Sequence, residues 1–169
     1  DDRLHGKNAL DRLLTTAFRY DADIVDGNYI SVSEDRMLNY EVRKYSDERV
    51  DPRGNLFGHA CGKVYARRLF RHLRFPEKYW FEDSVNAQII FPMAKSVYTI
   101  SDVVYEYTRN PDSITHTAAG KSKAVDSLYI TEALMKDKAL FGLELDSLDR
   151  RYFLKMIRLT YARTEAGGA

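Results

Sequence analysis

The segment DIVDGNYI, residues 23–30, decides how the rest of this sequence is interpreted. It is rich in β-branched and aromatic residues, which is typical of a strand. Apolar residues at helical spacing come before it and predict an amphipathic helix over residues 7–20. A second strand is predicted over residues 37–45, across a polar turn at residues 33–35. The chain is therefore expected to begin with a helix that is followed by paired strands.

The rest of the chain continues this alternation. The remaining predicted elements are strands over residues 59–65, 97–100 and 103–107, helical segments over residues 67–73 and 84–91, and two helices from about residue 121 that are separated near Gly142. The helix over 84–91 should direct Val85, Ile89 and Ile90 inward and stop at Pro92. This order predicts an α/β fold in which a mixed β-sheet is flanked by helices and followed by a C-terminal helical tail.

Composition limits the class of protein. The chain has 169 residues, which suits one domain with a sizeable core, and 44% of them are hydrophobic, which excludes disorder throughout. The net charge is +1, so there is no overall attraction to nucleic acid, and no nucleic-acid partner is expected. One cysteine and four scattered histidines are a poor basis for a zinc site. The single cysteine also excludes an intrachain disulfide and fits a reducing compartment.

The segment RFPEKYWFED, residues 74–83, combines an aromatic cluster with two adjacent carboxylates. Apolar rings beside Asp83 can raise its pKa toward the range that suits a general base. The rings, which include the only tryptophan, Trp80, can also form a platform for a sugar. The more ordinary interpretation of the pair by itself is that Glu82 and Asp83 begin a helix, because carboxylates favour the positive end of the helix dipole.

Several short stretches together resemble the family-2 glycosyltransferases with the GT-A fold, especially bacterial enzymes that build capsule, O-antigen or exopolysaccharide. The stretches are DDRL at residues 1–4 with the helix over 8–14, ADIVDG at 22–27, CGKVYARRLF at 61–70, RFPEKYWFED at 74–83 and YEYTRNPDSIT at 105–115. The resemblance lies in their order and spacing. It implies an acceptor-side half of a GT-A-like catalytic domain over residues 1–117, without the half that normally comes first, and a C-terminal helical segment over residues 118–169.

The resemblance implies an inverting, metal-dependent glycosyltransferase. Such an enzyme transfers a sugar from a nucleotide-diphosphate sugar to a glycan or lipid-linked acceptor, here in the synthesis of bacterial surface polysaccharide. Asp83 is then the general base, and Glu82 orients it or the acceptor. Asp2, with Asp1 beside it, is the expected ligand of Mg²⁺ or Mn²⁺, cations that prefer oxygen ligands. The ordinary alternative for Asp1 and Asp2 is a frayed terminus that caps the following helix.

The same resemblance implies substrate contacts from Trp80, Lys63, Arg109, Ser113 and His116. Arg109 and Ser113 are expected to face the donor diphosphate or the acceptor, and an arginine there can bind phosphate in a bidentate manner. His116 would contact the diphosphate, and Lys63 would line the acceptor channel. The ordinary alternatives are a surface arginine beside a turn, a solvated histidine and a lysine at a sheet edge.

The last predicted helix separates basic from apolar residues. Its basic face contains Arg151, Lys155 and Arg158, and its apolar face contains Leu148, Tyr152, Met156 and Leu159. The ordinary interpretation is a packing helix with a solvated basic face. The alternative is contact with an anionic membrane surface that presents a lipid-linked acceptor. The expected location is the cytoplasm. Peripheral contact at the inner face of the cell membrane is a further expectation, which follows from the membrane alternative.

Two other functions compete with the transferase. The first is a non-catalytic carbohydrate-binding or scaffold module that keeps only the aromatic platform. Such a module should tolerate the loss of Asp83, whereas the transferase should not. The second is a metal-dependent phosphotransferase or nuclease that uses Asp1, Asp2, Glu82 and Asp83, and it would need a further carboxylate or histidine cluster that the sequence does not place.

Overall fold

The computed structural model describes residues 2–33, 39–41 and 44–165. They form two compact units, each of which combines an earlier and a later segment of the chain. Unit 1 consists of Asp1–Leu73 and Ala94–Asn110, and unit 2 consists of Arg74–Met93 and Pro111–Ala169. The predicted boundary between residues 117 and 118 is not tested by this arrangement and stays a prediction.

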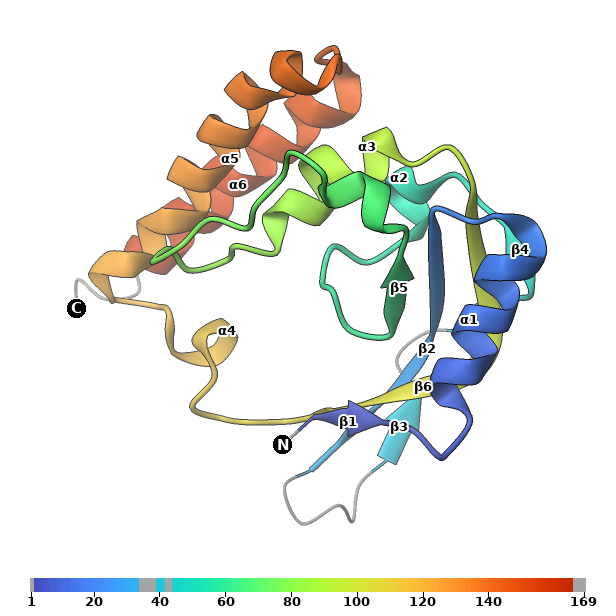
Figure 1. Ribbon diagram of the computed structural model, residues 1–169. Coiled ribbons are helices and arrows are strands. Elements are labelled where there is room, and N and C mark those ends of the chain that lie inside the picture. The colour runs from blue at the N-terminus through green and yellow to red at the C-terminus, as the bar shows by residue number, and fades with distance from the viewer. Residues whose placement is uncertain (1, 34–38, 42–43, 166–169) are drawn as a thin grey trace. The chain divides into compact units, whose positions relative to one another are not determined.

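Unit 1 is built on a mixed sheet, which has six strands within the described residues (Figure 1). Its two long strands, β2 (Ile24–Val32) and β6 (Val97–Thr108), are parallel neighbours. The short strands are antiparallel: β1 (Arg3–Leu4) and β4 (Glu48–Arg49) pair with β6, while β3 (Asn39–Glu41) and β5 (Lys63–Tyr65) pair with β2. Most of β2 is buried along consecutive residues, as expected for a central strand that is covered on both faces.

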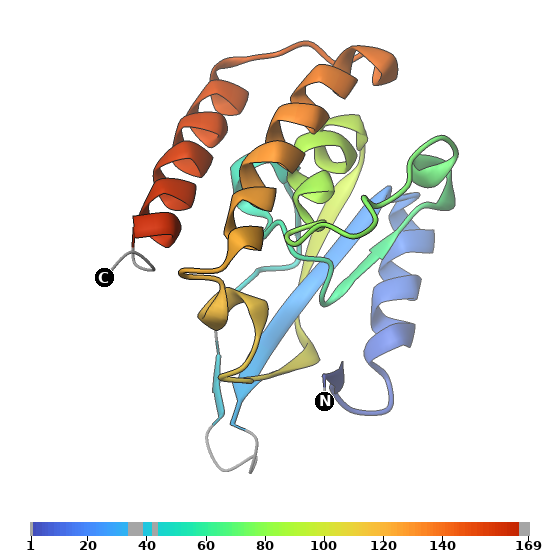
Figure 2. The ribbon, with the colours of Figure 1, turned by 90° about the vertical axis from the view of Figure 1, so that its left-hand side faces the viewer.

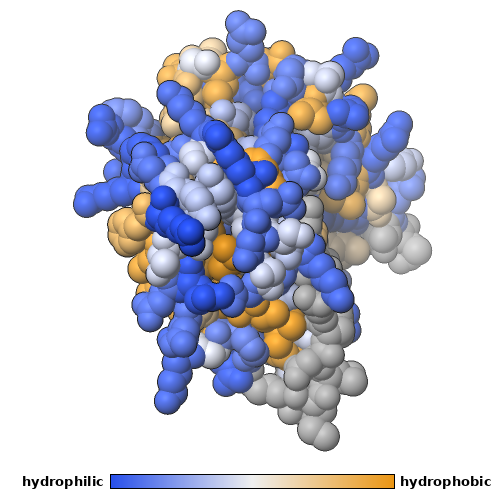
Figure 3. All heavy atoms as spheres, turned by 90° about the vertical axis from the view of Figure 1, so that its right-hand side faces the viewer, coloured by the Kyte–Doolittle hydropathy of each residue, from blue (hydrophilic) through white to orange (hydrophobic). Residues whose placement is uncertain are grey.

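Helix α1 (Ala9–Tyr20) packs against the two long strands of unit 1 (Figure 1). The buried core between them contains Ala9, Leu13, Ala22, Val25, Ile100 and Val104. The predicted helix is confirmed, but its apolar residues do not all point inward, because Leu10 is 46% and Phe18 82% exposed. Figure 3 shows this side of the molecule as mostly hydrophilic, with small separate hydrophobic patches. Unit 1 also contains the short helices α2 (Pro52–Asn55) and η1 (Arg67–Phe70).

A β-bulge explains why the sequence pattern predicts two strands where the structure has the single strand β6. The pairing of β6 with β2 shifts between Ile100 and Val103 and again between Val103 and Tyr105, so Ser101 and Asp102, and then Val104, are extra residues. The two polar residues among them interrupt the apolar pattern of the strand. The interruption therefore marks a local irregularity and not the end of an element.

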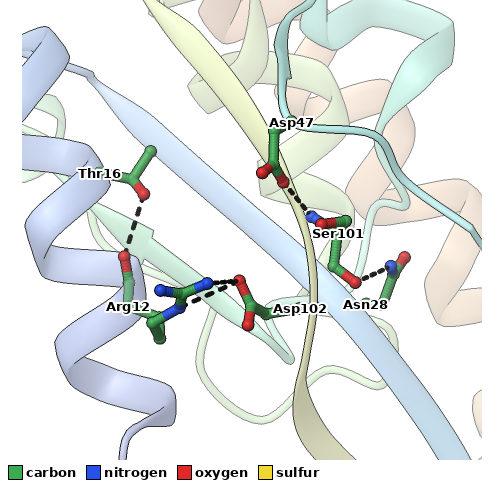
Figure 4. Close-up of polar contacts among 6 residues, drawn as sticks. All are labelled: Arg12, Thr16, Asn28, Asp47, Ser101 and Asp102. Carbon is green, nitrogen blue, oxygen red and sulfur yellow. Dashed lines mark hydrogen bonds and ion pairs between the residues drawn. The ribbon is translucent and has the colours of Figure 1, made fainter.

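The bulge is held by side chains from three other segments of unit 1 (Figure 4). Asp102 accepts hydrogen bonds from Nε and Nη2 of Arg12 in α1, at 3.1 and 2.8 Å. Asn28 donates its side-chain amide to the Ser101 carbonyl at 2.9 Å. The Ser101 N–H donates to the Asp47 carboxylate, and this bond lowers the pKa of Asp47. The predicted strand over residues 37–45 is represented by β3, and residues 34–38 and 42–43 lie outside the described residues.

Unit 2 is helical. Its first helix begins at Ser84 and continues through a π-helical turn, η2 (Asn86–Ile90), into α3 (Phe91–Met93). The predicted stop at Pro92 is therefore wrong, since the helix ends at Met93, two residues after the predicted last residue Phe91. The π-turn changes the hydrogen-bond pairing just before the proline. The three residues predicted to point inward are all fully buried: Val85, Ile89 and Ile90.

The C-terminal part of unit 2 is a helical hairpin. After the short segments α4 (Ile114–Thr117) and η3 (Ser122–Val125) come α5 (Asp126–Asp137), η4 (Lys138–Phe141) and α6 (Ser147–Glu165). Helices α5 and α6 pack side by side (Figure 2). The predicted break is confirmed, since Gly142 adopts a left-handed conformation with φ 69° after η4. No helix in the described part of the chain combines the length and apolar character that crossing a membrane requires.

Candidate functional site

Asp2 is fixed beside the far end of β6. Its Oδ1 accepts a hydrogen bond from the Thr108 N–H at 2.8 Å, and its Oδ2 accepts one from the Tyr105 hydroxyl at 3.1 Å. The pairing of Arg3 with Glu106 in the sheet brings these groups together. The Asp2 side chain is exposed. The carboxylate is therefore oriented by the protein, and each oxygen retains a lone pair for a ligand.

Tyr105 and Cys61 lie next to Asp2. Burial raises the pKa of the Tyr105 hydroxyl, and the neighbouring Cys61 and Asp2 raise it further. Burial also raises the pKa of the Cys61 thiol, which shares a hydrogen bond with Tyr105. Both groups therefore stay protonated at neutral pH, and Cys61 is not an activated nucleophile. The sequence reasoning gave neither residue a role, although Tyr105 belongs to the tyrosine-rich stretch that carried the resemblance.

The ammonium group of Lys63 lies inside unit 1. Its Nζ is 3.2 Å from Oδ2 of Asp26, and the two side chains are 0% and 2% exposed. Lys63 also donates to the Cys61 carbonyl at 3.3 Å, and the Tyr45 hydroxyl donates to Asp26 at 2.8 Å. The lysine is thus engaged with protein groups, and its predicted contact with substrate stays a prediction.

His59 forms an aromatic cluster that the sequence reasoning did not find. Its ring lies edge to face with Tyr29 at a centroid distance of 5.1 Å and stacks on Phe57 at 5.3 Å. Burial, with a smaller contribution from the charge of Lys63, lowers the pKa of His59 to about 4. The ring is therefore neutral at pH 7. No local sequence signal joins Tyr29 of β2 to the other two rings, which lie in the segment between α2 and β5.

In unit 2, Glu82 and Asp83 form the turn that starts the first helix. The Val85 N–H donates to the Glu82 carbonyl at 3.3 Å, and the Asn86 N–H donates to the Asp83 carbonyl at 2.9 Å. Glu82 is exposed and Asp83 is half-buried. The position of the pair at a helix start is thus confirmed, while its catalytic role stays a prediction.

The two aromatic residues before this turn are in contact with each other. The rings of Trp80 and Phe81 pack edge to face with their centroids 6.5 Å apart, and both side chains are half-buried. Both residues therefore keep some exposed surface directly before Glu82 and Asp83 in the chain. Whether the rings form a platform for a sugar stays a prediction.

The other predicted substrate contacts lie around the end of β6 and on α4. Arg109 is exposed and follows Thr108, whose N–H binds Asp2. Ser113 occupies the N-cap position of α4, and the exposed His116 lies within that helix. Of the predicted site residues, unit 1 contains Asp2, Lys63 and Arg109, and unit 2 contains Trp80, Glu82, Asp83, Ser113 and His116. Asp1 lies outside the described residues.

A divalent cation would find one anchored ligand at Asp2. Over the described part of the chain, no group of three or more His, Cys, Asp or Glu side chains is arranged to hold a metal ion. Mg²⁺, however, is often bound by one or two carboxylates, with substrate phosphates and water as the other ligands. The exposed and oriented carboxylate of Asp2 fits that mode of binding, and a metal at this position stays a prediction.

Comparison with known proteins finds similarity at the level of structure only. No protein-family model matches the chain, and no curated protein matches it in sequence. Among solved structures, S. aureus TarS 1–349 in complex with UDP-GlcNAc matches with a TM-score of 0.66 and 15% identity, over 99% of this chain and 48% of that chain. The same protein in complex with UDP matches with a TM-score of 0.52 and 16% identity, over 95% of this chain and 53% of that chain.

A further crystal structure of S. aureus TarS matches with a TM-score of 0.52 and 16% identity, over 99% of this chain and 34% of that chain. This chain thus spans about half the length of TarS 1–349. TarS is a glycosyltransferase. The mixed sheet, its helices and the C-terminal helical segment therefore form a partial GT-A-like α/β fold, as the sequence predicts.

Proposed function

We propose that this chain forms the acceptor-side part of an inverting family-2 glycosyltransferase. The enzyme would use a nucleotide-diphosphate sugar as donor and a glycan or lipid-linked acceptor, in the synthesis of bacterial surface polysaccharide. The observation that carries the proposal is the likeness in fold, over 99% of this chain, to a glycosyltransferase that was solved with UDP-GlcNAc. The Glu82–Asp83 turn and the oriented carboxylate of Asp2 support it.

In this proposal Asp83 is the general base. It accepts the proton of the acceptor hydroxyl while that oxygen attacks the anomeric carbon opposite the leaving diphosphate, so the configuration inverts. A free aspartate has a pKa of about 3.9 and is a weak base, but exclusion of water by a bound acceptor strengthens it. The half-buried position of Asp83 supports this role. Glu82, which is exposed, orients the acceptor.

Asp2, together with Asp1, would hold Mg²⁺ or Mn²⁺. The bound cation would neutralise the negative charge that develops on the leaving diphosphate. The hydrogen bonds from Tyr105 and Thr108 support the role of Asp2, because they orient its carboxylate before any donor arrives. Arg109, which follows Thr108 in the chain, would bind a donor phosphate through its guanidinium group.

Peripheral contact with an anionic membrane is part of the proposal for a lipid-linked acceptor. Three basic residues of α6 are exposed along one side of the helix: Arg151, Lys155 and Arg158. Sedimentation with liposomes tests this contact. Binding should be stronger to anionic than to neutral lipid, and equal binding to both would end this part of the proposal.

The function is tested by Asp83→Asn in the full-length protein. Release of UDP from UDP-GlcNAc is measured, with other nucleotide-diphosphate sugars in parallel. Loss of a positioned general base should lower turnover by about 10²–10⁴ and leave donor binding unchanged in calorimetry. Asp137→Asn is the control, since it makes the same chemical change at an exposed position of unit 2. Near wild-type turnover in Asp83→Asn would contradict the role, and absence of turnover in the wild type would favour the carbohydrate-binding alternative.

A further inference from the structure

The C-terminal helices contact the backbone that leads into the Glu82–Asp83 turn. We call residues Lys78–Phe81 the lead segment. We infer that Asp126 is a positioning residue for catalysis, which holds the lead segment so that Asp83 faces the acceptor. The inference rests on the proposed function, and it assigns a part in the reaction to the C-terminal helical segment, whose sequence resembles no family.

The lead segment has a backbone conformation that needs support from outside. Lys78 and Phe81 adopt φ angles of 70° and 65°, although neither is glycine. Side chains with a Cβ atom disfavour this left-handed region, so residues stay in it only where the surrounding structure holds them. Both residues lie within five positions of Asp83. A loss of that support should therefore change the direction of the Asp83 side chain.

Asp126 provides the central support. Its Oδ2 accepts a hydrogen bond from the Trp80 N–H at 2.9 Å, between the two left-handed residues. Asp126 is the first residue of α5 and is only 9% exposed. A hydrogen bond from a backbone N–H to a buried carboxylate is charge-assisted and stronger than one between neutral groups. The contact joins residues 46 positions apart in the chain, so it fixes the lead segment to the helical hairpin.

Two further contacts fix the ends of the lead segment. Lys123 donates its Nζ to the Lys78 carbonyl at 2.9 Å. At the other end, the guanidinium carbon of Arg163 lies 4.3 Å from the centroid of the Phe81 ring, in a cation–π arrangement. The contacts come from η3, α5 and α6, and each of these elements supplies one of them. The segment is therefore held at three points within four residues.

The turn that follows transmits this position to Asp83. The Phe81 carbonyl accepts a hydrogen bond from the Ser84 N–H at 3.1 Å, which spans Glu82 and Asp83. Tyr152 of α6 shares a hydrogen bond with the Ser84 side chain and lies close enough to Asp83 for that negative charge to affect it. Asp83 is thus flanked in the chain by the lead segment on one side and by Ser84, which contacts Tyr152 of α6, on the other.

The test removes the side-chain carboxylate of residue 126, which accepts the hydrogen bond from the Trp80 N–H. In the full-length protein, Asp126→Ala should make the Trp80 amide hydrogen exchange about 10- to 100-fold faster, as measured by NMR, because a charge-assisted hydrogen bond is lost. The kcat for UDP release from UDP-GlcNAc should fall by about 10²-fold, since a misplacement of about 1 Å can have an effect of this size. Donor affinity in calorimetry should not change. This separation of kcat from donor affinity distinguishes positioning from a general loss of structure.

Two variants serve as controls. Asp126→Asn keeps a side-chain oxygen that can accept the Trp80 N–H, so it should restore most of the kcat that Asp126→Ala loses. Glu132→Gln makes the same change of charge on the same helix, at an exposed side chain paired with Lys136, and should match the wild type. If Asp126→Ala does not fold, Arg163→Met removes the Phe81 contact instead and should lower kcat in the same direction.

The outcomes separate this inference from the proposed function. Wild-type kcat in Asp126→Ala, combined with an inactive Asp83→Asn, would overturn the inference and leave the proposed function intact. Wild-type kcat in both variants would overturn the proposed function. An unchanged exchange rate at Trp80 would show that the lead segment does not depend on Asp126 and would also overturn the inference.

Discussion

Each unit buries a lysine against an aspartate, but the two pairs are held in different ways. In unit 1, Lys63 lies 3.2 Å from Asp26, and these residues are direct partners in the pairing of β5 with β2. In unit 2, Lys138 lies 2.9 Å from Asp149, and the pair connects η4 to α6 with both side chains 1% exposed. The sheet ladder would keep Lys63 beside Asp26 even without their attraction. No ladder does this for Lys138 and Asp149.

The two pairs differ in whether strand pairing also holds the residues together, and this difference bears on how much each ion pair contributes to stability. Burying two charges costs free energy that their attraction only partly offsets, so a buried pair by itself is weak support for stability. The cost of removing one partner depends on what remains around the other. We therefore expect the unit 2 pair to be the more sensitive of the two.

The largest effect is expected for Lys138→Met. It leaves the Asp149 carboxylate buried without its cation and with the Asp146 N–H, at 3.0 Å, as a remaining donor. The free energy of unfolding should fall by about 3–5 kcal/mol. Urea unfolding followed by circular dichroism measures the change. The double variant Lys138→Met/Asp149→Leu should recover most of the loss, because an apolar pair of similar volume often replaces a buried ion pair at little cost. A single variant within about 1 kcal/mol of the wild type would contradict the assigned importance of the pair.

A smaller effect is expected for Lys63→Met in unit 1. Asp26 keeps the hydrogen bond from the Tyr45 hydroxyl, and the strand pairing stays in place. The free energy of unfolding should fall by about 2–3 kcal/mol, the range for a charged group that loses one of its partners. Lys63→Met combined with Tyr45→Phe should approach the loss seen for Lys138→Met. Equal losses for the two single lysine variants would remove the distinction between the units.

Much of unit 1 could be predicted from the sequence, because its signals are local. The β-branched run of β2 and the helical spacing before it identified both elements. The bulge at Ser101 and Asp102 could not be predicted as such, because it depends on the register between strands. The pairing of Lys63 with Asp26 depends on the same register, so the sequence offered Lys63 as a substrate contact.

In the candidate site, too, local features could be predicted from the sequence and long-range contacts could not. Glu82 and Asp83 could be found because they are adjacent and follow aromatic residues. The contacts that hold them could not, since the hydrogen bond between Trp80 and Asp126 spans 46 positions and leaves no periodic trace in the sequence. Asp126 is the first residue of α5 in the structure, and an aspartate at a helix start signals only a favourable dipole interaction. The two left-handed residues of the lead segment were likewise invisible, because neither is glycine.

The close packing of the two long strands in unit 1 predicts an intermediate effect for Gly27→Ala. A Cβ atom at residue 27 would lie 2.5 and 2.8 Å from the two methyl carbons of Val104, which is fully buried. Overpacking of this kind should lower the free energy of unfolding by about 1–3 kcal/mol, measured by urea unfolding. Gly27→Ala combined with Val104→Ala should lose less than the sum of the single changes, since the smaller residue 104 leaves room for the new methyl group. Simple additivity would argue against the close approach.

The smallest effect is a pH dependence that belongs to unit 1. His59 has a pKa of about 4 in the folded protein, against about 6.5 for a free histidine. Between these values the unfolded chain binds more protons, so the free energy of unfolding should fall as the pH is lowered from about 6.5 to about 4 and should be unaffected by His59 above that window. The loss should be about 1–2 kcal/mol, because the half-buried ring is partly screened by solvent.

Urea unfolding of the wild type and of His59→Phe, at a series of pH values, isolates this contribution, since phenylalanine keeps a ring against Phe57 and Tyr29. The wild type should lose stability relative to His59→Phe across the window, and parallel curves would contradict the assignment. The same pH series, measured on the two lysine variants, compares the buried pairs by their effect on the pKa of His59. Lys63 is the charged side chain that lowers the pKa of His59, so Lys63→Met should raise that pKa in the folded protein. The loss of stability should then end at a higher pH, and its total should be smaller. Lys138→Met should leave the His59 titration where it is, because burial, the charge of Lys63 and backbone hydrogen bonds set the pKa of His59.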